Sequence, residues 1–369
     1  MKLVCSKSNL LNGVNIVSKA VPNRTTMSIL ECILIDASGS SIKLIANDTE
    51  LGIETIVEGD IKEKGKIALD AKILTEIVRK LPDSDVTIEC DSSLKTYIVC
   101  DKANFTIIGK PADEFTYLPN VERLDSINVS QFTLKEVIRQ TIFSIADNDN
   151  NKIMTGELFE INNDILKVVS LDGHRISVRK INLKSSYNNK KVIVPGKTLN
   201  EISKILSGEA DKDVNIFFTG KHIIFEFDST TVVSRLIEGE YFKIDQMLSS
   251  DYETKVSINK KDLYNSIDRA TLLVKEGDKK PIIMNITDES IELKINSTVG
   301  SLDEEISITK QGKDILIGFN PKFLMDALRV IDDEVIDIYL VNPKAPCFIK
   351  NSEESYIYMV LPVNFTTVS

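Results

Sequence analysis

The chain carries three copies of one sequence segment, and this repetition restricts the possible folds more than any other feature. The copies align on Leu74, Leu199 and Leu324, each 125 residues after the previous one. Around each anchor the pattern is the same: lysine two positions before, an acid two after, a basic residue five after and apolar residues seven away on both sides. Tandem copies predict similar folding units, each with its own core. The predicted domains are residues 1–124, 125–250 and 251–369.

A second segment also recurs three times, aligned on Leu10, Leu134 and Leu263. Apolar residues lie three or four positions apart in each copy, which is typical of an amphipathic helix. Polar residues near the starts of these segments are candidate N-caps: Ser8, Thr133 and Asp262.

Between the helical segments the apolar pattern changes to a period of two, which indicates β-strands. Examples are residues 42–46, 166–169, 223–227 and 291–295. The steady alternation of strand and helix that builds a parallel nucleotide-binding sheet is missing. The sequence therefore predicts an α+β protein of three repeated domains, each with two helices and an antiparallel sheet.

The net charge of -10 argues, taken alone, against nucleic-acid binding, because phosphate neutralisation needs lysine and arginine. The charges are unevenly distributed, however, because each of the six predicted helices is net positive. These helices are 7–20, 71–81, 131–146, 196–206, 260–273 and 321–331. One interpretation is a set of solvated helix faces with local ion pairs. The other is a mildly cationic surface that holds a polyanion loosely and without reading its sequence.

Composition excludes several classes of protein. Hydrophobic residues make up 42% and charged residues 27% of the chain, which is typical of globular rather than disordered proteins. No apolar run approaches the roughly 20 residues of a membrane span, and the first residues lack the apolar stretch of a signal peptide, so we expect a cytoplasmic location. The five cysteines include no CxxC pair and predict neither zinc nor a disulfide framework.

Enzyme motifs are also missing from the sequence. There is no glycine-rich phosphate loop, histidine metal motif or nucleophile elbow, so we predict no cofactor, no metal and no catalytic residue. Asp172, His174 and Arg175 are the nearest approach to a catalytic cluster. Successive side chains of an extended segment point to opposite faces, so these three residues need not converge.

Several strings, in their order and spacing, resemble the bacterial sliding clamp family, the beta subunits of DNA polymerase III. The most specific is SLDGHRIS at residues 170–177. The others are VPNRTTMSIL from Val21, GKIALDAKILTEIVRKLP from Gly65, VIVPGKTLNEISKIL from Val192, IGFNPKFLMDAL from Ile317 and YMVLPV from Tyr358. The resemblance covers nearly the whole chain.

This resemblance implies the DNA clamp fold, in which two three-domain subunits form a head-to-tail dimeric ring around duplex DNA. Helices would face the hole and sheets would lie outside. The implied function is a non-catalytic processivity factor, near the nucleoid, that binds DNA without sequence preference. The implied partners are the DNA polymerase III alpha subunit, a clamp loader and other proteins with a clamp-binding motif.

The resemblance also implies an apolar pocket between the second and third domains, which binds partner peptides that contain Gln followed by Leu and Phe. Apolar walls with a few polar groups suit such a pocket, and methionine adapts to several partners. The matching positions are Met154, Leu171, Gly173, His174, Arg175, Ile176, Phe242, Met247, Asn320, Phe323, Pro346, Val360, Leu361, Pro362 and Val363. The alternative for all of them is ordinary core.

Two further sets of positions follow from the resemblance. The positions implied for DNA contact, some only at long range, are Arg24, Lys72, Arg79, Lys135, Arg139, Lys152, Lys197, Lys204 and Lys322. The positions implied for the dimer interface are Phe105 and Ile107 on an edge strand and Leu272 and Leu273 at a helix end. For the last four, packing inside their own domain is the alternative.

The sequence departs from the family at three places: Phe242 stands where proline is usual, Gln246 where some members have arginine, and 364–369 extend beyond the common end. These differences affect the shape of the pocket and its peptide preference. Three rival interpretations remain: an enzyme, a three-repeat protein-interaction scaffold that does not act on DNA, and a trimeric clamp. Three repeats per chain favour a dimer over a trimer.

Overall fold

The computed structural model describes the chain except for residues 120, 124, 148–149, 249–250, 275–279 and 366–369. The predicted domain boundaries at Leu124 and Ser250 lie outside the described residues and stay predictions. The contacts divide the chain into two compact units. Unit 1 is Met1–Lys135 with Lys197–Leu236, and unit 2 is Glu136–Gly196 with Ile237–Ser369.

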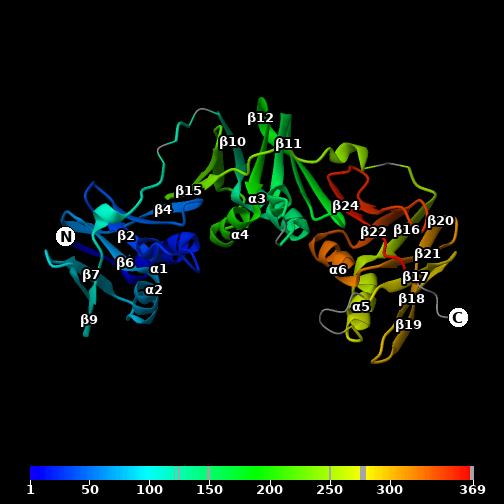
Figure 1. The fold of residues 1–369 in the computed structure, drawn as a ribbon, viewed down its shortest axis with the longest axis horizontal. Coiled ribbons are helices and arrows are strands. Elements are labelled where there is room, and N and C mark those ends of the chain that lie inside the picture. Colours follow the sequence, from blue (N-terminus) through cyan, green and yellow to red (C-terminus); the bar gives the residue numbers. More distant parts are fainter. Residues whose placement is uncertain (120, 124, 148–149, 249–250, 275–279, 366–369) are drawn as a thin grey trace. The chain divides into compact units, whose positions relative to one another are not determined.

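Six α-helices occur in the described part of the chain, two in each repeat, as the sequence predicts (Figure 1). They are α1 (Lys7–Val17), α2 (Ala71–Lys80), α3 (Gln131–Thr141), α4 (Gly196–Ile205), α5 (Lys260–Thr271) and α6 (Pro321–Val330). The predicted ends of the first and third helices were too late, because α1 and α3 tighten into 3-10 turns at Ser18–Ala20 and Ile142–Ser144.

The predicted N-caps were wrong by two or three residues. The side chain of Ser6 accepts a hydrogen bond from the backbone N–H of Asn9, and Ser130 does the same for Thr133. Asn259 accepts from the N–H groups of two residues in the first turn of α5. Each cap is the last residue of the preceding strand, so strand and helix follow each other without a loop. Ser8, Thr133 and Asp262 therefore lie inside the helices.

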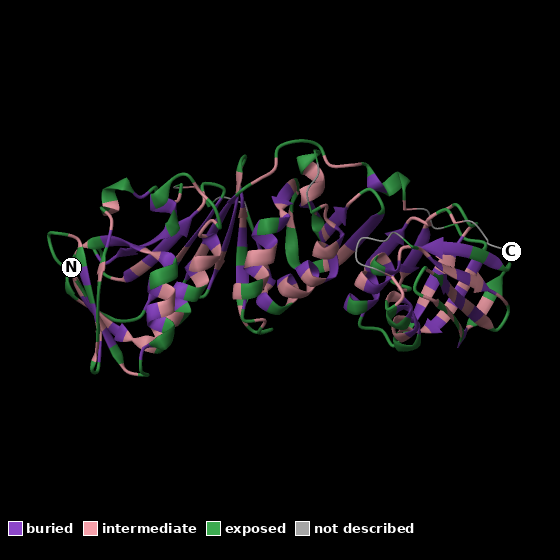
Figure 2. Cartoon of the chain, turned by 60° about the horizontal axis from the view of Figure 1, so that its bottom comes forward, coloured by how far each residue is buried: buried purple, intermediate pink, exposed green. Residues whose placement is uncertain are grey.

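The repeated leucines form the apolar side of the helices. The anchors Leu74, Leu199 and Leu324 are at most 3% exposed, and Leu10, Leu134 and Leu263 are 1% exposed. Burying one leucine side chain stabilises a fold by about 1.5–3 kcal/mol. Core formation therefore explains why these positions recur. Figure 2 shows the same helices with exposed residues along their other side.

Unit 1 contains two antiparallel sheets. The five-stranded sheet has the order β5 (Asp60–Glu63), β1 (Lys2–Ser6), β7 (Asp85–Cys90), β8 (Lys95–Cys100), β9 (Ala103–Ile108). The eight-stranded sheet has the order β10 (Asp125–Ser130), β13 (Asp213–Phe218), β14 (His222–Phe227), β15 (Thr230–Arg235), β4 (Leu51–Val57), β3 (Ile42–Asn47), β2 (Cys32–Asp36), β6 (Lys66–Asp70).

Unit 2 contains two more antiparallel sheets. The seven-stranded sheet has the order β11 (Gly156–Leu171), β12 (Arg175–Pro195), β24 (Tyr356–Val360), β23 (Cys347–Lys350), β22 (Val335–Leu340), β16 (Thr254–Asn259), β20 (Thr309–Gly312). The four-stranded sheet has the order β19 (Ser301–Ser307), β18 (Ser290–Asn296), β17 (Ile282–Ile286), β21 (Ile315–Phe319).

Adjacent repeats are joined by strand pairing. In unit 1, β15 of the second repeat pairs with β4 of the first, and the hydroxyls of Thr55 and Thr230 lie 2.9 Å apart in the buried seam. In unit 2, β24 of the third repeat pairs with β12 of the second, with Arg175 opposite Val360 and Arg179 opposite Tyr356. Two sheets therefore contain strands of two repeats each, which is why the compact units do not follow the repeats.

One acidic residue is enclosed in the core of unit 2. Glu157, the second residue of β11, is 0% exposed, and neither of its carboxyl oxygens has a hydrogen-bond partner among the described residues. Burial raises the pKa of Glu157 well above its usual value, because the charged form loses its hydration. The neutral acid is thus the form that fits the fold.

We predict that Glu157→Gln stabilises the protein at about pH 8 and has little effect at about pH 4. The wild-type protein keeps its full stability below the pKa of the unfolded carboxyl and loses stability as the pH rises through the raised pKa of the fold. Each pKa unit corresponds to about 1.4 kcal/mol. Urea unfolding across this pH range measures the difference.

The control is Glu353→Gln, the same isosteric change at an exposed turn, which should leave stability unchanged at every pH. A Glu157→Gln variant that is less stable than wild type at high pH would contradict a neutral buried carboxyl.

Candidate functional site

The tight turn between β11 and β12 forms one end of the site. Oδ1 of Asp172 accepts hydrogen bonds from the backbone N–H of His174 at 3.0 Å and of Arg175 at 3.2 Å. Gly173 occupies the left-handed region at φ +84°, which a residue without Cβ adopts at little cost. His174 is exposed, and its ring stacks on Phe323 with 5.8 Å between centroids.

Arg175 is buried at the joint between the second and third repeats. Its guanidinium donates to Oδ2 of Asp172 at 3.0 Å and to Oδ2 of Asp326 on α6 at 2.7 Å. A third bond reaches the carbonyl of Phe143, and the group lies over the rings of Phe143 and Phe323. Asp172 and Arg175 therefore do converge, contrary to the alternation argument, because a turn and not an extended strand connects them.

A cluster of apolar side chains lies beside this joint, and we call it the apolar cluster. Its buried members are Leu158, Val169, Leu171, Ile176, Val178, Ile244, Phe348, Ile357 and Met359. Half-buried side chains that pack against it are Met154, Tyr241, Phe242, Leu248, Tyr339 and Leu361. Of the predicted pocket residues, the structure brings together Met154, Leu171, Ile176, Phe242 and Leu361 in this cluster.

The remaining predicted pocket residues occupy different surroundings. Asn320 caps α6, its side chain accepting from the backbone N–H of Lys322 at 3.0 Å. Met247 is 48% exposed, whereas Val360 is 2% exposed and belongs to the core of the third repeat. Pro346, Pro362 and Val363 are half-buried.

The last strand shows which pocket residues the sequence reasoning missed. Along β24 and its end, Ile357, Met359 and Leu361 pack in the apolar cluster, while Tyr356, Tyr358 and Val360 pack in the core of the third repeat. This alternation of period two is visible in the sequence and could have identified Met359. Backbone hydrogen bonds then tie the tail to the site, from Leu361 N–H to His174 O and from Val363 N–H to Gly318 O.

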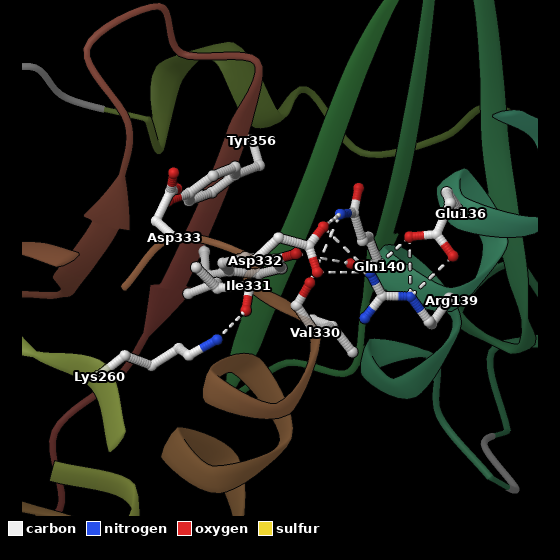
Figure 3. Close-up of polar contacts among 10 residues, drawn as sticks. Glu136, Arg139, Gln140, Lys260, Val330, Ile331, Asp332, Asp333 and Tyr356 are labelled. Atoms are coloured by element: carbon white, nitrogen blue, oxygen red, sulfur yellow. Dashed lines mark hydrogen bonds and ion pairs between the residues drawn. The ribbon is translucent and has the colours of Figure 1, made fainter. Parts of the chain in front are cut away.

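A second polar group connects the same repeats and includes a predicted DNA contact (Figure 3). Arg139 on α3 pairs with Glu136 at 2.5 Å and with Asp332, beyond the end of α6, at 3.1 Å. Gln140 donates to Asp332 and to the Val330 carbonyl. Arg139 is therefore engaged inside the protein.

The nine predicted DNA-contact residues fall into two groups. Four have exposed side chains with no polar partner among the described residues: Arg24, Lys72, Lys152 and Lys322. The others have internal partners: Arg79 with Glu76, Arg139 with Glu136 and Asp332, Lys197 with Asp48, Lys204 with Glu201, and Lys135 with the Leu206 carbonyl.

The predicted dimer residues lie at exposed edges of their units. Phe105 is 39% exposed and Ile107 half-buried on β9, the outermost strand of the five-stranded sheet. Leu272, directly after α5, is 80% exposed, and the neighbouring Leu273 is half-buried.

Within the described residues, no group of three or more His, Cys, Asp or Glu side chains is arranged to hold a metal ion. Among the same residues, none of the helices is long and apolar enough to cross a membrane.

Comparison with known sequences gives three matches that cover the chain in order. Family models of the DNA polymerase III beta subunit match at residues 1–119 for the N-terminal domain, 128–243 for the central domain and 245–364 for the C-terminal domain. A beta sliding clamp from Staphylococcus epidermidis is 33% identical over 374 residues, which cover 98% of this chain and 99% of the relative.

The chain belongs to the DNA polymerase III beta subunit family, the beta sliding clamps. Its function is that of a sliding clamp, a non-catalytic subunit of the polymerase, and its three domains have the clamp fold.

Solved clamp structures agree with this assignment. A protein assigned as a DNA polymerase III beta subunit from Eubacterium rectale has 72% sequence identity and a TM-score of 0.96, and the match covers 99% of this chain and 100% of that one. The DNA polymerase sliding clamp of Bacillus subtilis has 32% identity and a TM-score of 0.95, with the same coverage.

Proposed function

We propose that two copies of this clamp subunit close head to tail into a ring around duplex DNA, and that the ring tethers the replicative polymerase through the apolar cluster. The proposed partners are duplex DNA of any sequence, the polymerase III alpha subunit, a clamp loader and other proteins with a clamp-binding peptide. The proposed place of action is the cytoplasm, at the nucleoid.

The observation that carries this proposal is a rule of strand pairing. In both joints the last strand of one repeat pairs with the fourth strand of the repeat before it: β15 with β4, and β24 with the part of β12 that corresponds to β4. By the same rule β9, the last strand of the first repeat, needs the fourth strand of a repeat placed before the first. In the third repeat this fourth strand is β19. Both strands are outermost in their sheets and have unpaired edges.

A second copy of the chain satisfies the rule for both strands. An isologous contact would pair β9 with β9, whereas the rule pairs β9 of one copy with β19 of the other and so gives a head-to-tail dimer with two equal seams. Pairing also removes two open sheet edges that otherwise favour aggregation. Phe105, Ile107, Leu272 and Leu273 lie at or near these edges and would be buried in the seams.

We predict that Phe105→Asp with Ile107→Asp converts the dimer into monomers at micromolar concentration, because two carboxylates would be buried in each seam without partners. Native mass spectrometry measures the assembly state. Ile73→Asp, at an apolar residue on α2 that is 49% exposed, is the control and should remain dimeric. A wild-type protein that is monomeric under these conditions would contradict the ring.

DNA binding is proposed to depend on enclosure more than on adhesion. Only four of the predicted cations have side chains free of internal partners among the described residues, and the whole chain is net negative. Each phosphate contact contributes about one unit to the salt dependence of binding. Four contacts per subunit hold DNA weakly, so a closed path around the duplex is needed for lasting association.

We predict that the loaded protein stays on closed circular DNA and leaves when the circle is linearised. A scaffold that does not act on DNA would show neither behaviour.

Replacement of Lys72 or Lys322 by alanine should lower the salt slope of equilibrium binding by about one unit, whereas Lys204→Ala, which removes a lysine already paired with Glu201, should change it less. Gel filtration of loaded circles and a salt titration measure the two effects, and equal slopes for all three variants would contradict the division into free and paired cations.

Partner binding is proposed to occur on the apolar cluster. The half-buried side chains of Met154, Phe242 and Leu361 lie over a buried apolar base, and the exposed Met247 follows the 3-10 turn of Ile244–Gln246. Leucine and phenylalanine side chains of a partner peptide would cover this surface, and burial of a full side chain contributes about 1.5–3 kcal/mol.

We predict that Leu361→Asp weakens binding of a Gln-Leu-x-Leu-Phe peptide by at least about tenfold, because a carboxylate would replace part of the apolar surface. Isothermal titration calorimetry measures the affinity. The control is Val335→Asp, at an exposed apolar residue outside the cluster. Arg175 is unsuitable for this test, since its replacement would remove the ion-pair partner of Asp172 and the closer of the two partners of Asp326 at the joint. Unchanged affinity in Leu361→Asp would contradict the site.

A further inference from the structure

A pocket of about 280 Å³ lies on unit 2 next to the apolar cluster. Its lining residues are Lys167, Lys180, Asp245, Leu248, Phe348, Lys350, Glu354 and Ile357. Leu248, Phe348 and Ile357 also belong to the apolar cluster or pack against it. The floor of this pocket therefore continues the apolar surface, while its walls are charged.

The strands fix the distance between Lys180 in the pocket and Ile176 in the apolar cluster. Ile176, Val178 and Lys180 alternate along β12, and the first two lie in the cluster while the third lines the pocket. On the neighbouring strand β11, Val169 lies in the cluster and Lys167 lines the pocket. On β24, Met359 lies in the cluster, and Ile357 belongs both to the cluster and to the pocket lining. Lys180 lies four positions after Ile176, which is roughly 13 Å of strand.

Two of the three lysines are neutralised within the protein. Lys167 pairs with Asp245 at 2.7 Å and with Glu160 at 3.5 Å, and its side chain is 15% exposed. Lys350 pairs with Glu354 at 2.5 Å, and its side chain is 13% exposed. Both lysines are thus nearly buried, while their acids are more exposed, Asp245 at 79% and Glu354 at 42% of the side chain.

Lys180 is the third cation, and its ammonium has no partner in the described part of the chain. Its backbone N–H bonds to the carbonyl of Ser355, which fixes the strand but leaves the side chain unpaired. The pKa values of Asp245 and Glu354 lie below their usual range, chiefly because of Lys167 and Lys350 respectively, with a smaller contribution from Lys180. Lys180 thus lies near two carboxylates that already have other partners, and the lining has an excess of one positive charge.

We propose that this pocket binds the carboxylate of a glutamate in the same partner peptide that docks on the apolar cluster. The inference rests on the docking site proposed above. Glutamate fits the two halves of the pocket, since its methylene groups suit the floor of Leu248, Phe348 and Ile357 and its carboxylate suits the unpaired Lys180. An extended peptide covers roughly 13 Å in four residues, so the acid stands about four residues from the Leu-Phe anchor.

Fluorescence anisotropy of the full-length protein with three labelled peptides tests this proposal. One peptide carries Gln-Leu-x-Leu-Phe in neutral flanks, and the other two add one glutamate four residues before or four residues after the anchor. One of the two acidic peptides should bind roughly three- to fivefold more tightly than the neutral peptide, as expected for one partly exposed ion pair. That gain, but not the affinity of the neutral peptide, should decrease with added salt.

Substitution of the lysine provides the second arm. Lys180→Met keeps the aliphatic stem and should abolish the gain while leaving the neutral peptide unaffected. Lys221→Met removes an exposed lysine of unit 1 and changes the net charge equally, so it should preserve the gain.

The outcomes separate the two proposals. If the neutral peptide does not bind the wild-type protein, the docking site on the apolar cluster is wrong. If it binds but neither glutamate adds affinity, or if the gain survives Lys180→Met or high salt, only the acidic subsite is overturned.

Discussion

Antiparallel pairing between the edge strands of successive repeats is the constraint on which the rest of this structure depends. A single repeat leaves its last strand and its fourth strand with unpaired backbone groups, and each joint satisfies both at once. The pairing also fixes register, because a slip by one residue would turn every buried side chain outward. Among the described residues, one edge of β9 and one edge of β19 remain unpaired. The proposed assembly with a further copy would continue the same backbone pairing.

The joint between β12 and β24 also builds the candidate binding surface. It brings the turn at Asp172 close to α6. Arg175 lies between them and donates hydrogen bonds to the carboxylates of Asp172 and Asp326 and to the carbonyl of Phe143. A buried guanidinium is costly unless its donors are satisfied, so the position of Asp326 and the position of the turn depend on each other. The apolar cluster takes residues from both repeats and is therefore formed only when the joint is formed.

The sequence predicted those features that follow from local periodicity. The repeated leucines marked the helices and their buried sides, and alternation marked strands such as β14 and β18. Features that depend on distant partners were not predictable. The ion pair between Arg139 and Asp332 joins residues 193 positions apart, and only the joint brings them together. The N-caps were misplaced because several polar residues flank each helix start, and the choice depends on where the preceding strand ends. The burial of Glu157 has no signal in its neighbours.

The arrangement of charge explains why enclosure suits this molecule. Some cations of the helices pair with acids of the same helix or a nearby turn. These cations contribute little to phosphate binding, because the internal ion pair must break before the cation can pair with a DNA phosphate. Lys197 with Asp48 and Lys204 with Glu201 are of this kind. An acidic protein with few free cations has a low affinity for any one DNA site, and low affinity permits sliding. In the proposed ring, persistence on DNA comes from the closed path of covalent chain and paired strands. The strength of the proposed β9–β19 seam, and not the number of lysines, would then set the lifetime of the complex.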